Sequence, residues 1–170
     1  YTGDIGHVDA DGFLFITDRK KNILVTSGGK NVAPAPIENA MVNSPYIEQS
    51  VVIGDNRNFI SALIVPSFEA VENYLMERGN TAKDNGDIIQ DPDVISLIEE
   101  EVGTAMKSFS NYERVKEFEL LPRIFTLENG ELTPTLKVVR KVVLENFSDS
   151  VEKIYSRSKK SSEQMEAELL

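Results

Sequence analysis

Two short stretches of this chain place cations beside glycine and hydroxyl residues. The first, residues 17–32, carries one acid and four cations, which are Arg19, Lys20, Lys21 and Lys30. The second, residues 132–141, carries no acid and three cations, which are Lys137, Arg140 and Lys141. Backbone N–H groups, hydroxyls and cations are the donors that a phosphate or carboxylate ligand needs. The two stretches therefore indicate an anionic ligand, with solvated loops that balance nearby acids as the alternative.

The rest of the chain is acidic. Its 170 residues include 18 Lys and Arg against 28 Asp and Glu, which gives a formal charge of -10. Such a chain is poorly suited to nucleic acid, whose phosphates require a broad basic face. The absence of cysteine excludes a disulfide frame, a thiolate zinc site and a cysteine nucleophile, and it favours a cytoplasmic location. No apolar run approaches the ~20 residues of a membrane-spanning helix.

Hydrophobic periodicity and turn residues predict a mixture of strands and helices. The expected strands are a hairpin over 6–16 and single strands over 23–26, 48–53, 59–65 and 117–121. The expected helices cover 37–42 and 138–155 and begin after Ser67 and Asp91. Residues 80–90 are polar without periodicity and predict a mobile surface excursion. The mixture predicts an α+β fold with small, mostly antiparallel sheets and packed helices.

Three motifs follow one another along the chain. They are Tyr1-Thr2-Gly3-Asp4, the stretch from Thr17-Asp18-Arg19 to Ala33-Pro34, and Asn129-Gly130-Glu131-Leu132-Thr133-Pro134-Thr135-Leu136-Lys137. In this order and at these spacings they resemble the C-terminal part of the AMP-forming acyl-CoA synthetases, in the adenylate-forming superfamily. The second and third motifs are most similar to the long-chain fatty acid–CoA ligase branch. The resemblance covers most of the chain, as far as Tyr155.

The resemblance implies a division of the chain into four parts. Residues 1–18 correspond to the last hairpin of an N-terminal adenylation domain that is otherwise missing, and residues 19–22 to a hinge. Residues 23–155 correspond to the mobile C-terminal lid domain, and residues 156–170 to a frayed tail. On this interpretation the chain is a piece of a longer enzyme and is inactive alone.

The resemblance also implies a two-step reaction. A fatty acid carboxylate attacks the α-phosphate of ATP to give an acyl-adenylate and pyrophosphate, and the thiol of coenzyme A then displaces AMP. ATP, Mg2+ and coenzyme A are thus the expected substrates or cofactors of the full-length acid–thiol ligase. Its expected partner is the N-terminal adenylation domain, which in this family carries the ATP phosphate loop and the acyl tunnel. Peripheral membrane contact through that domain stays open. No metal site or transmembrane segment is expected in this chain.

By resemblance, three residues act on the nucleotide and the acyl group. Lys137 is the expected catalytic lysine, which reaches the substrate carboxylate and the α-phosphate and offsets their repulsion. Asp4 is expected to accept hydrogen bonds from the ribose hydroxyls, and Arg19 to reach the ribose or the phosphates. The alternatives are a turn cap for Asp4, an ion pair with Asp18 for Arg19, and an exposed lysine before a helix for Lys137.

The resemblance places the second step at another loop. Lys21 is the expected hinge, about which the small domain swings between the two half-reactions. Ser27, Gly28, Gly29 and Lys30 are the residues expected to bind coenzyme A, because glycines permit close backbone approach. The alternative for the glycine pair is an ordinary turn that ends a strand.

The chain also departs from its relatives. Many of them have Ser-Gly directly before the catalytic lysine, whereas this chain has Thr135-Leu136, so the geometry of that loop cannot be transferred. His7 is expected to be structural. No carrier-protein serine motif follows, which favours free coenzyme A as the acceptor. The other functions that remain open are an aryl or luciferase-like adenylating ligase and a stand-alone module that binds an anionic ligand.

Overall fold

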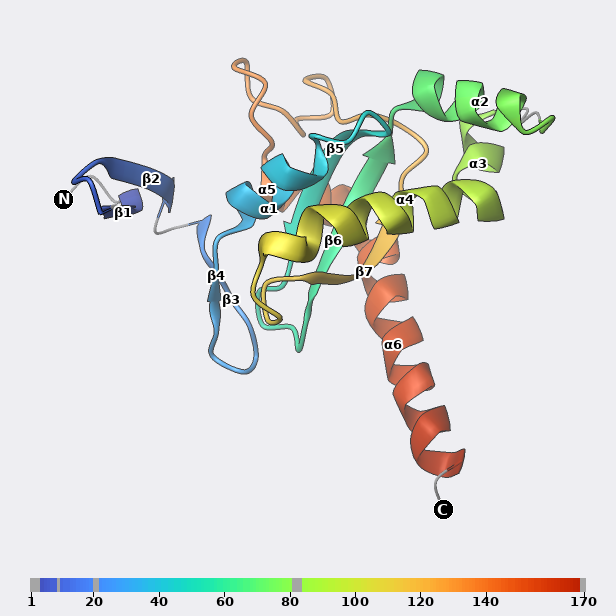
Figure 1. The fold of residues 1–170 in the computed structure, drawn as a ribbon. Coiled ribbons are helices and arrows are strands. Elements are labelled where there is room, and N and C mark those ends of the chain that lie inside the picture. Colours follow the sequence, from blue (N-terminus) through green and yellow to red (C-terminus); the bar gives the residue numbers. More distant parts are fainter. Residues whose placement is uncertain (1–3, 9, 20–21, 81–83, 169–170) are drawn as a thin grey trace.

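The computed structural model describes residues 4–8, 10–19, 22–80 and 84–168. Its first element is an antiparallel hairpin of β1 (Asp4–Val8) and β2 (Leu14–Arg19). The hairpin lies to one side of the other elements (Figure 1). It exposes Val8, Phe13 and Leu14. The hairpin expected over residues 6–16 is therefore confirmed, and these three apolar side chains are not part of the main core.

A three-stranded sheet forms the centre of the main body. Strands β5 (Ile47–Ile53) and β6 (Ile60–Pro66) are antiparallel, and β7 (Val115–Leu120) pairs with β6 in parallel. All of β6 is buried, because it is the middle strand and helices cover both of its faces. The α+β class is confirmed. The parallel pair arises because the chain passes through three helices before it returns as β7.

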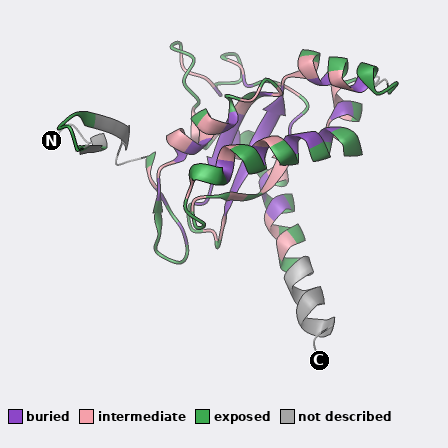
Figure 2. Ribbon diagram, in the orientation of Figure 1, coloured by how far each residue is buried: buried purple, intermediate pink, exposed green. Residues whose placement is uncertain are grey.

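One face of this sheet packs against the helices that lie between β4 and β7 in the chain. They are α1 (Pro34–Met41), α2 (Phe68–Glu77), α3 (Asn85–Ile88) and α4 (Pro92–Ala105), which is followed by a 3-10 turn, Met106–Ser108. Val52, Ala62 and Ile64 of the sheet contribute to this core. Helix α4 crosses in front of the sheet, with its buried residues toward the strands (Figures 1 and 2).

The opposite face of the sheet packs against the two C-terminal helices, α5 (Arg140–Asn146) and α6 (Ser148–Glu168). Val51, Ile53, Leu63 and Val65 point into this second core, in the alternation expected of strands buried on both faces. The single helix predicted over 138–155 is instead two helices, since Phe147 leaves helical geometry at φ -115° and ψ 30°. Helix α6 then continues through residues 156–168, where the sequence predicted a frayed tail.

Strand β4 (Asn31–Val32) and helix α3 were not predicted. Strand β4 pairs with β3 (Leu24–Val25), so the predicted strand over 23–26 is one half of a hairpin. Residues 80–90 were expected to be a mobile excursion, and this prediction is wrong for its second half, which contains α3. The Asp84 carboxylate accepts a hydrogen bond from the Asp87 N–H at 2.9 Å, and the Ile88 side chain is fully buried. One buried isoleucine is too little to produce a periodic pattern. Among the described helices none is long and apolar enough to span a membrane.

Candidate functional site

Lys137 lies on a tight hairpin loop, residues 131–139, which we call the Lys137 loop. Its two sides meet at a bridge between Leu132 and Val138. The Thr133 N–H donates to the Lys137 carbonyl at 2.8 Å, and the Lys137 N–H donates to the Thr133 hydroxyl at 3.1 Å. The Lys137 side chain is exposed. The loop therefore fixes the backbone of the lysine and leaves its ammonium group accessible.

Leu136, directly before the lysine, has a left-handed backbone with φ 57°. Its N–H closes the turn by donating to the Thr133 carbonyl at 2.8 Å. This conformation costs a non-glycine residue roughly 1–2 kcal/mol. The sequence resemblance places a glycine here in many relatives, and this chain reaches the left-handed turn with a leucine. The Leu136 side chain, like that of Lys137, is exposed.

Glu131 fixes the first side of the Lys137 loop. Its carboxylate is fully buried and accepts two hydrogen bonds from the Arg123 guanidinium, at 2.7 and 2.8 Å. It also accepts from the Asn146 amide at 2.9 Å and from the Thr126 N–H at 3.1 Å. The hydrogen bond from Arg123 is the main cause that lowers the pKa of Glu131 to about 2. Glu131 belongs to the third sequence motif, but no role was predicted for it.

Arg140 fixes the second side of the same loop. Its guanidinium donates to the Glu38 carboxylate at 2.7 Å and to the Val52 carbonyl at 2.5 Å. The Glu38 carboxylate also accepts from the Val52 N–H at 2.8 Å. These two side chains thus bond the backbone at the free edge of β5, as a neighbouring strand would. Of the three cations in residues 132–141, Arg140 is therefore structural, while Lys137 and Lys141 are exposed.

Residues 27–30 form the turn between β3 and β4, which we call the glycine turn. Within it, Gly29 has φ +74°, so this position requires the conformational freedom of glycine. The Gly29 N–H donates to the Thr26 carbonyl at 2.8 Å, and the Lys30 N–H donates to the Thr26 hydroxyl at 3.1 Å. The Lys30 ammonium lies 5.6 Å from the centre of the Tyr112 ring. The turn is exposed throughout and keeps a defined shape.

The glycine turn is held by the loop between β5 and β6. The Ser27 N–H donates to the Arg57 carbonyl at 2.9 Å, and the Val25 N–H to the Asp55 carboxylate at 3.0 Å. In Figure 1 the β3–β4 hairpin and the loops that precede α5 lie toward opposite ends of the main body. The structure thus does not bring the glycine turn and Lys137 together into one site.

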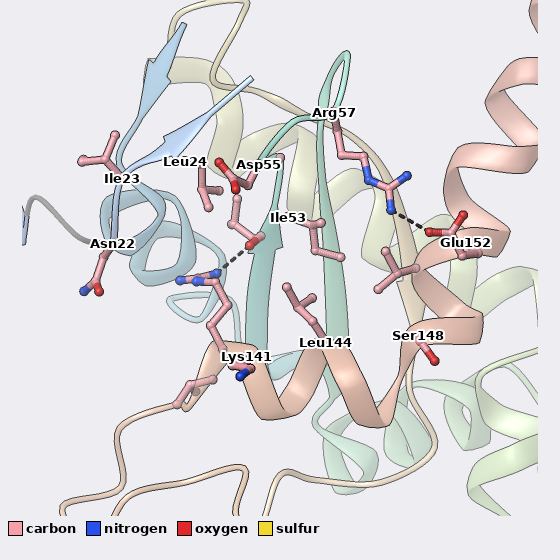
Figure 3. A pocket seen from close by; sticks show the side chains of 15 residues that line it. Asn22, Ile23, Leu24, Ile53, Asp55, Arg57, Lys141, Leu144, Ser148 and Glu152 are labelled. Carbon is pink, nitrogen blue, oxygen red and sulfur yellow. Dashed lines mark hydrogen bonds and ion pairs between the residues drawn. The ribbon is translucent and has the colours of Figure 1, made fainter. Parts of the chain in front are cut away.

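A pocket of about 720 Å³ lies between these two ends. Its walls come from β3, the end of β5, and helices α5 and α6. Figure 3 shows an apolar interior that includes Ile53 and Leu144, with Lys141 and the Arg57–Glu152 ion pair (2.6 Å) around it. Asn22, at the predicted hinge, also lines this pocket. Within the described residues no group of three or more His, Cys, Asp or Glu could hold a metal ion.

The other predicted site residues belong to the start of the chain. Asp4 and Arg19 are paired positions in the β1–β2 register, so the backbone places the two expected nucleotide-binding residues directly across from each other. Lys21, the expected hinge, lies outside the described residues. The first cationic stretch therefore extends from β2 into the β3–β4 hairpin, across two separate structural elements.

The family of the chain follows from comparison with known proteins. The model of the AMP-binding enzyme C-terminal domain matches residues 21–159. The chain belongs to this family. It is 49% identical over 157 residues to the long-chain-fatty-acid--CoA ligase FadD15 of Mycobacterium tuberculosis, covering 92% of this chain and 26% of that protein.

Further relatives give the same result. The long-chain-fatty-acid--CoA ligase ACSBG1 of Bos taurus is 33% identical over 177 residues, covering 94% of this chain and 24% of that protein. Among solved structures, the A domain of a carboxylic acid reductase from Segniliparus rugosus, in complex with AMP and a co-purified carboxylic acid, is similar with a TM-score of 0.74 and 27% identity. That match covers 92% of this chain and 23% of the reductase chain. The chain thus spans about a quarter of the length of these proteins.

The buried Glu131 carboxylate makes the stability of the chain depend on pH. Its pKa is lowered on folding, so its ion pair stabilises the folded state above pH 4.5 and is lost as the pH falls toward about 2. Because Arg123 is partly open to solvent, we expect this contribution to be on the order of 1–3 kcal/mol. Glu131→Gln should lower the free energy of unfolding at pH 7 by that amount and flatten its fall between pH 4.5 and 2.

This prediction is measured by urea unfolding at a series of pH values. Glu145→Gln is the matched control, because Glu145 is exposed and its ion pair with Lys141, at 3.8 Å, is exposed as well. The control should keep the slope of the unmodified chain. An equally steep loss of stability on acidification in Glu131→Gln would contradict the assignment.

Proposed function

We propose that this chain is the C-terminal part of a longer AMP-forming acid–thiol ligase that joins a fatty acid to coenzyme A. The observation that carries the proposal is the exposed Lys137, presented on a loop whose two sides are each fixed by a buried or half-buried ion pair. The relatives named as long-chain fatty acid ligases support the substrate class. They are about four times as long as this chain, which favours part of an enzyme over a stand-alone binding module.

In the first half-reaction, Lys137 would serve as a positioned cation. A carboxylate and a triphosphate repel each other, and an ammonium group between them stabilises the negative charge that develops at the α-phosphate. An exposed lysine on a fixed backbone can enter a site formed by another domain. Mg2+ would arrive with ATP, because the described residues of this chain offer no cluster of ligands for it. Asp4 and Arg19 would contact the ribose and phosphates from the hairpin.

In the second half-reaction, the glycine turn would contact coenzyme A. The exposed turn offers the Ser27 hydroxyl and the Lys30 cation to an extended ligand with phosphate groups, and Gly28 and Gly29 let such a ligand approach the backbone closely. The glycine turn and Lys137 lie toward opposite ends of the main body, so one reaction centre can meet both only if this domain turns. We place the axis of that rotation at Lys21, between the hairpin and β3.

The role of Lys137 predicts a selective loss. In the full-length enzyme, Lys137→Ala should slow formation of the acyl-adenylate about 10²–10³-fold, the size of effect expected from removal of one preorganised charge donor. Conversion of supplied acyl-adenylate and coenzyme A to the thioester should stay within about threefold of the parent rate. The two rates are measured separately, by pyrophosphate release and by thioester formation.

Lys141→Ala is the control for this experiment, because Lys141 is an exposed cation on the same stretch that lies 3.8 Å from Glu145 and has no proposed role in either half-reaction. It should keep both rates. Formation of acyl-adenylate at the parent rate in Lys137→Ala would show that the assignment of this lysine is wrong.

The role of the glycine turn predicts the opposite selectivity. Gly29→Val puts a β-branched side chain at φ +74° and should distort the turn, because such residues are strongly disfavoured there. Thioester formation should fall by about tenfold or more, whereas adenylate formation should be nearly unchanged. Gly79→Val is the matched control, since Gly79 has the same φ in a turn after α2. Equal effects of the two substitutions on thioester formation would refute a specific role for the glycine turn.

A further inference from the structure

The position of Lys137 depends on backbone bonds, because its side chain is exposed. Thr133 and Lys137 bond each other through both backbone and hydroxyl groups. Two residue pairs farther from the tip, beyond the Leu132–Val138 bridge, the Glu131 carbonyl accepts a hydrogen bond from the Val139 N–H at 2.8 Å. The lysine therefore lies near the tip of a short two-sided stem whose base is formed by Glu131 and Val139.

Glu131 attaches the base of this stem to the rest of the domain. Its carboxylate bonds Arg123 and Thr126 in the segment after β7, and Asn146 at the end of α5. Its backbone adds a bond from the Glu131 N–H to the Thr126 carbonyl at 3.1 Å. One side chain thus joins three segments, and no water-exposed surface remains on it.

Arg123, the partner of Glu131, is itself held in place. Its guanidinium carbon lies 4.6 Å from the centre of the Phe147 ring, at the junction of α5 and α6. Phe147 in turn meets the buried Phe125 ring edge-on, with ring centres 6.0 Å apart. A planar fork of two parallel hydrogen bonds between Arg123 and Glu131 allows little rotation about the contact. These contacts therefore fix both the position and the direction of the stem base.

We propose that Glu131, held by Arg123, is a positioning residue for Lys137 in acyl-adenylate formation. This inference rests on the function proposed above. Glu131 touches neither substrate nor nucleotide, and it acts by setting the direction of the stem that carries the lysine. A displacement of about 1 Å at a reacting group can reduce a rate by as much as 10²-fold. The loss should therefore fall on the half-reaction that uses Lys137.

The experiment measures both half-reactions of the full-length enzyme with Glu131→Gln. Gln removes the charge and one side of the fork but keeps the shape of the side chain. We expect adenylate formation to fall by about tenfold or more, with thioester formation from supplied acyl-adenylate within about threefold of the parent rate. Arg123→Lys, which keeps the charge but loses the planar fork, should show the same selectivity with a smaller loss.

Lys153→Gln is the control, because it removes a different ion pair, with Glu119, between α6 and β7. It should keep both rates. Equal loss of both rates in Glu131→Gln would assign Glu131 a purely structural role, and full retention of both would show that the stem does not depend on it. Either result overturns the inference. If Glu131→Gln fails to fold, Arg123→Lys is judged by the same two rates.

The same assay separates this inference from the proposed function. If Lys137→Ala leaves adenylate formation intact, the role of the lysine fails, and Glu131 has nothing to position. If Lys137→Ala is impaired while Glu131→Gln and Arg123→Lys are not, only the positioning inference fails.

Discussion

The loop that carries Lys137 depends on one buried carboxylate. A charged group removed from water is strongly destabilising unless it is paired and its remaining acceptors are satisfied. Glu131 meets this condition with four hydrogen bonds, from Arg123, Asn146 and the Thr126 backbone. Because these partners come from two other segments, the one after β7 and the end of α5, the carboxylate can be satisfied only when both are in their folded positions beside the loop. The interaction therefore specifies one arrangement of the loop and of α5 more than it adds to overall stability.

The central sheet separates the two ends at which chemistry is proposed. Strand β6 is buried between two helical layers, and a different part of the domain supports each functional loop. At the Lys137 loop, Asn146 of α5 bonds Glu131, and Arg140, which directly follows the loop, bonds Glu38 and Val52. The turn between β5 and β6 holds the glycine turn through Asp55 and Arg57. A domain with one of these loops at each end suits the proposed rotation, in which each loop serves one half-reaction.

Much of the fold could be predicted from the sequence, whereas the supports of the site could not. The hairpin, β5, β6 and the helix after Asp91 follow from long periodic runs and from a cap that the structure contains, the Asp91 carboxylate bonded to the Asp93 N–H at 2.9 Å. Helix α3 and strand β4 are too short to leave a period. The burial of Glu131 leaves no trace in a chain with 28 acids, since a buried and an exposed glutamate look alike until Arg123 and Asn146 are placed around one of them. The left-handed backbone of Leu136 could not be predicted either, because leucine is not a residue typical of such a turn.

The most direct test of this account is a double-mutant cycle on the rate of acyl-adenylate formation, with Glu131→Gln and Lys137→Ala made singly and together in the full-length enzyme. If Glu131 acts through the lysine, its substitution lowers the rate of the parent but changes the rate of Lys137→Ala by less than about twofold, because the group that it positions is already gone. The same fold-loss from Glu131→Gln in both backgrounds would contradict the account.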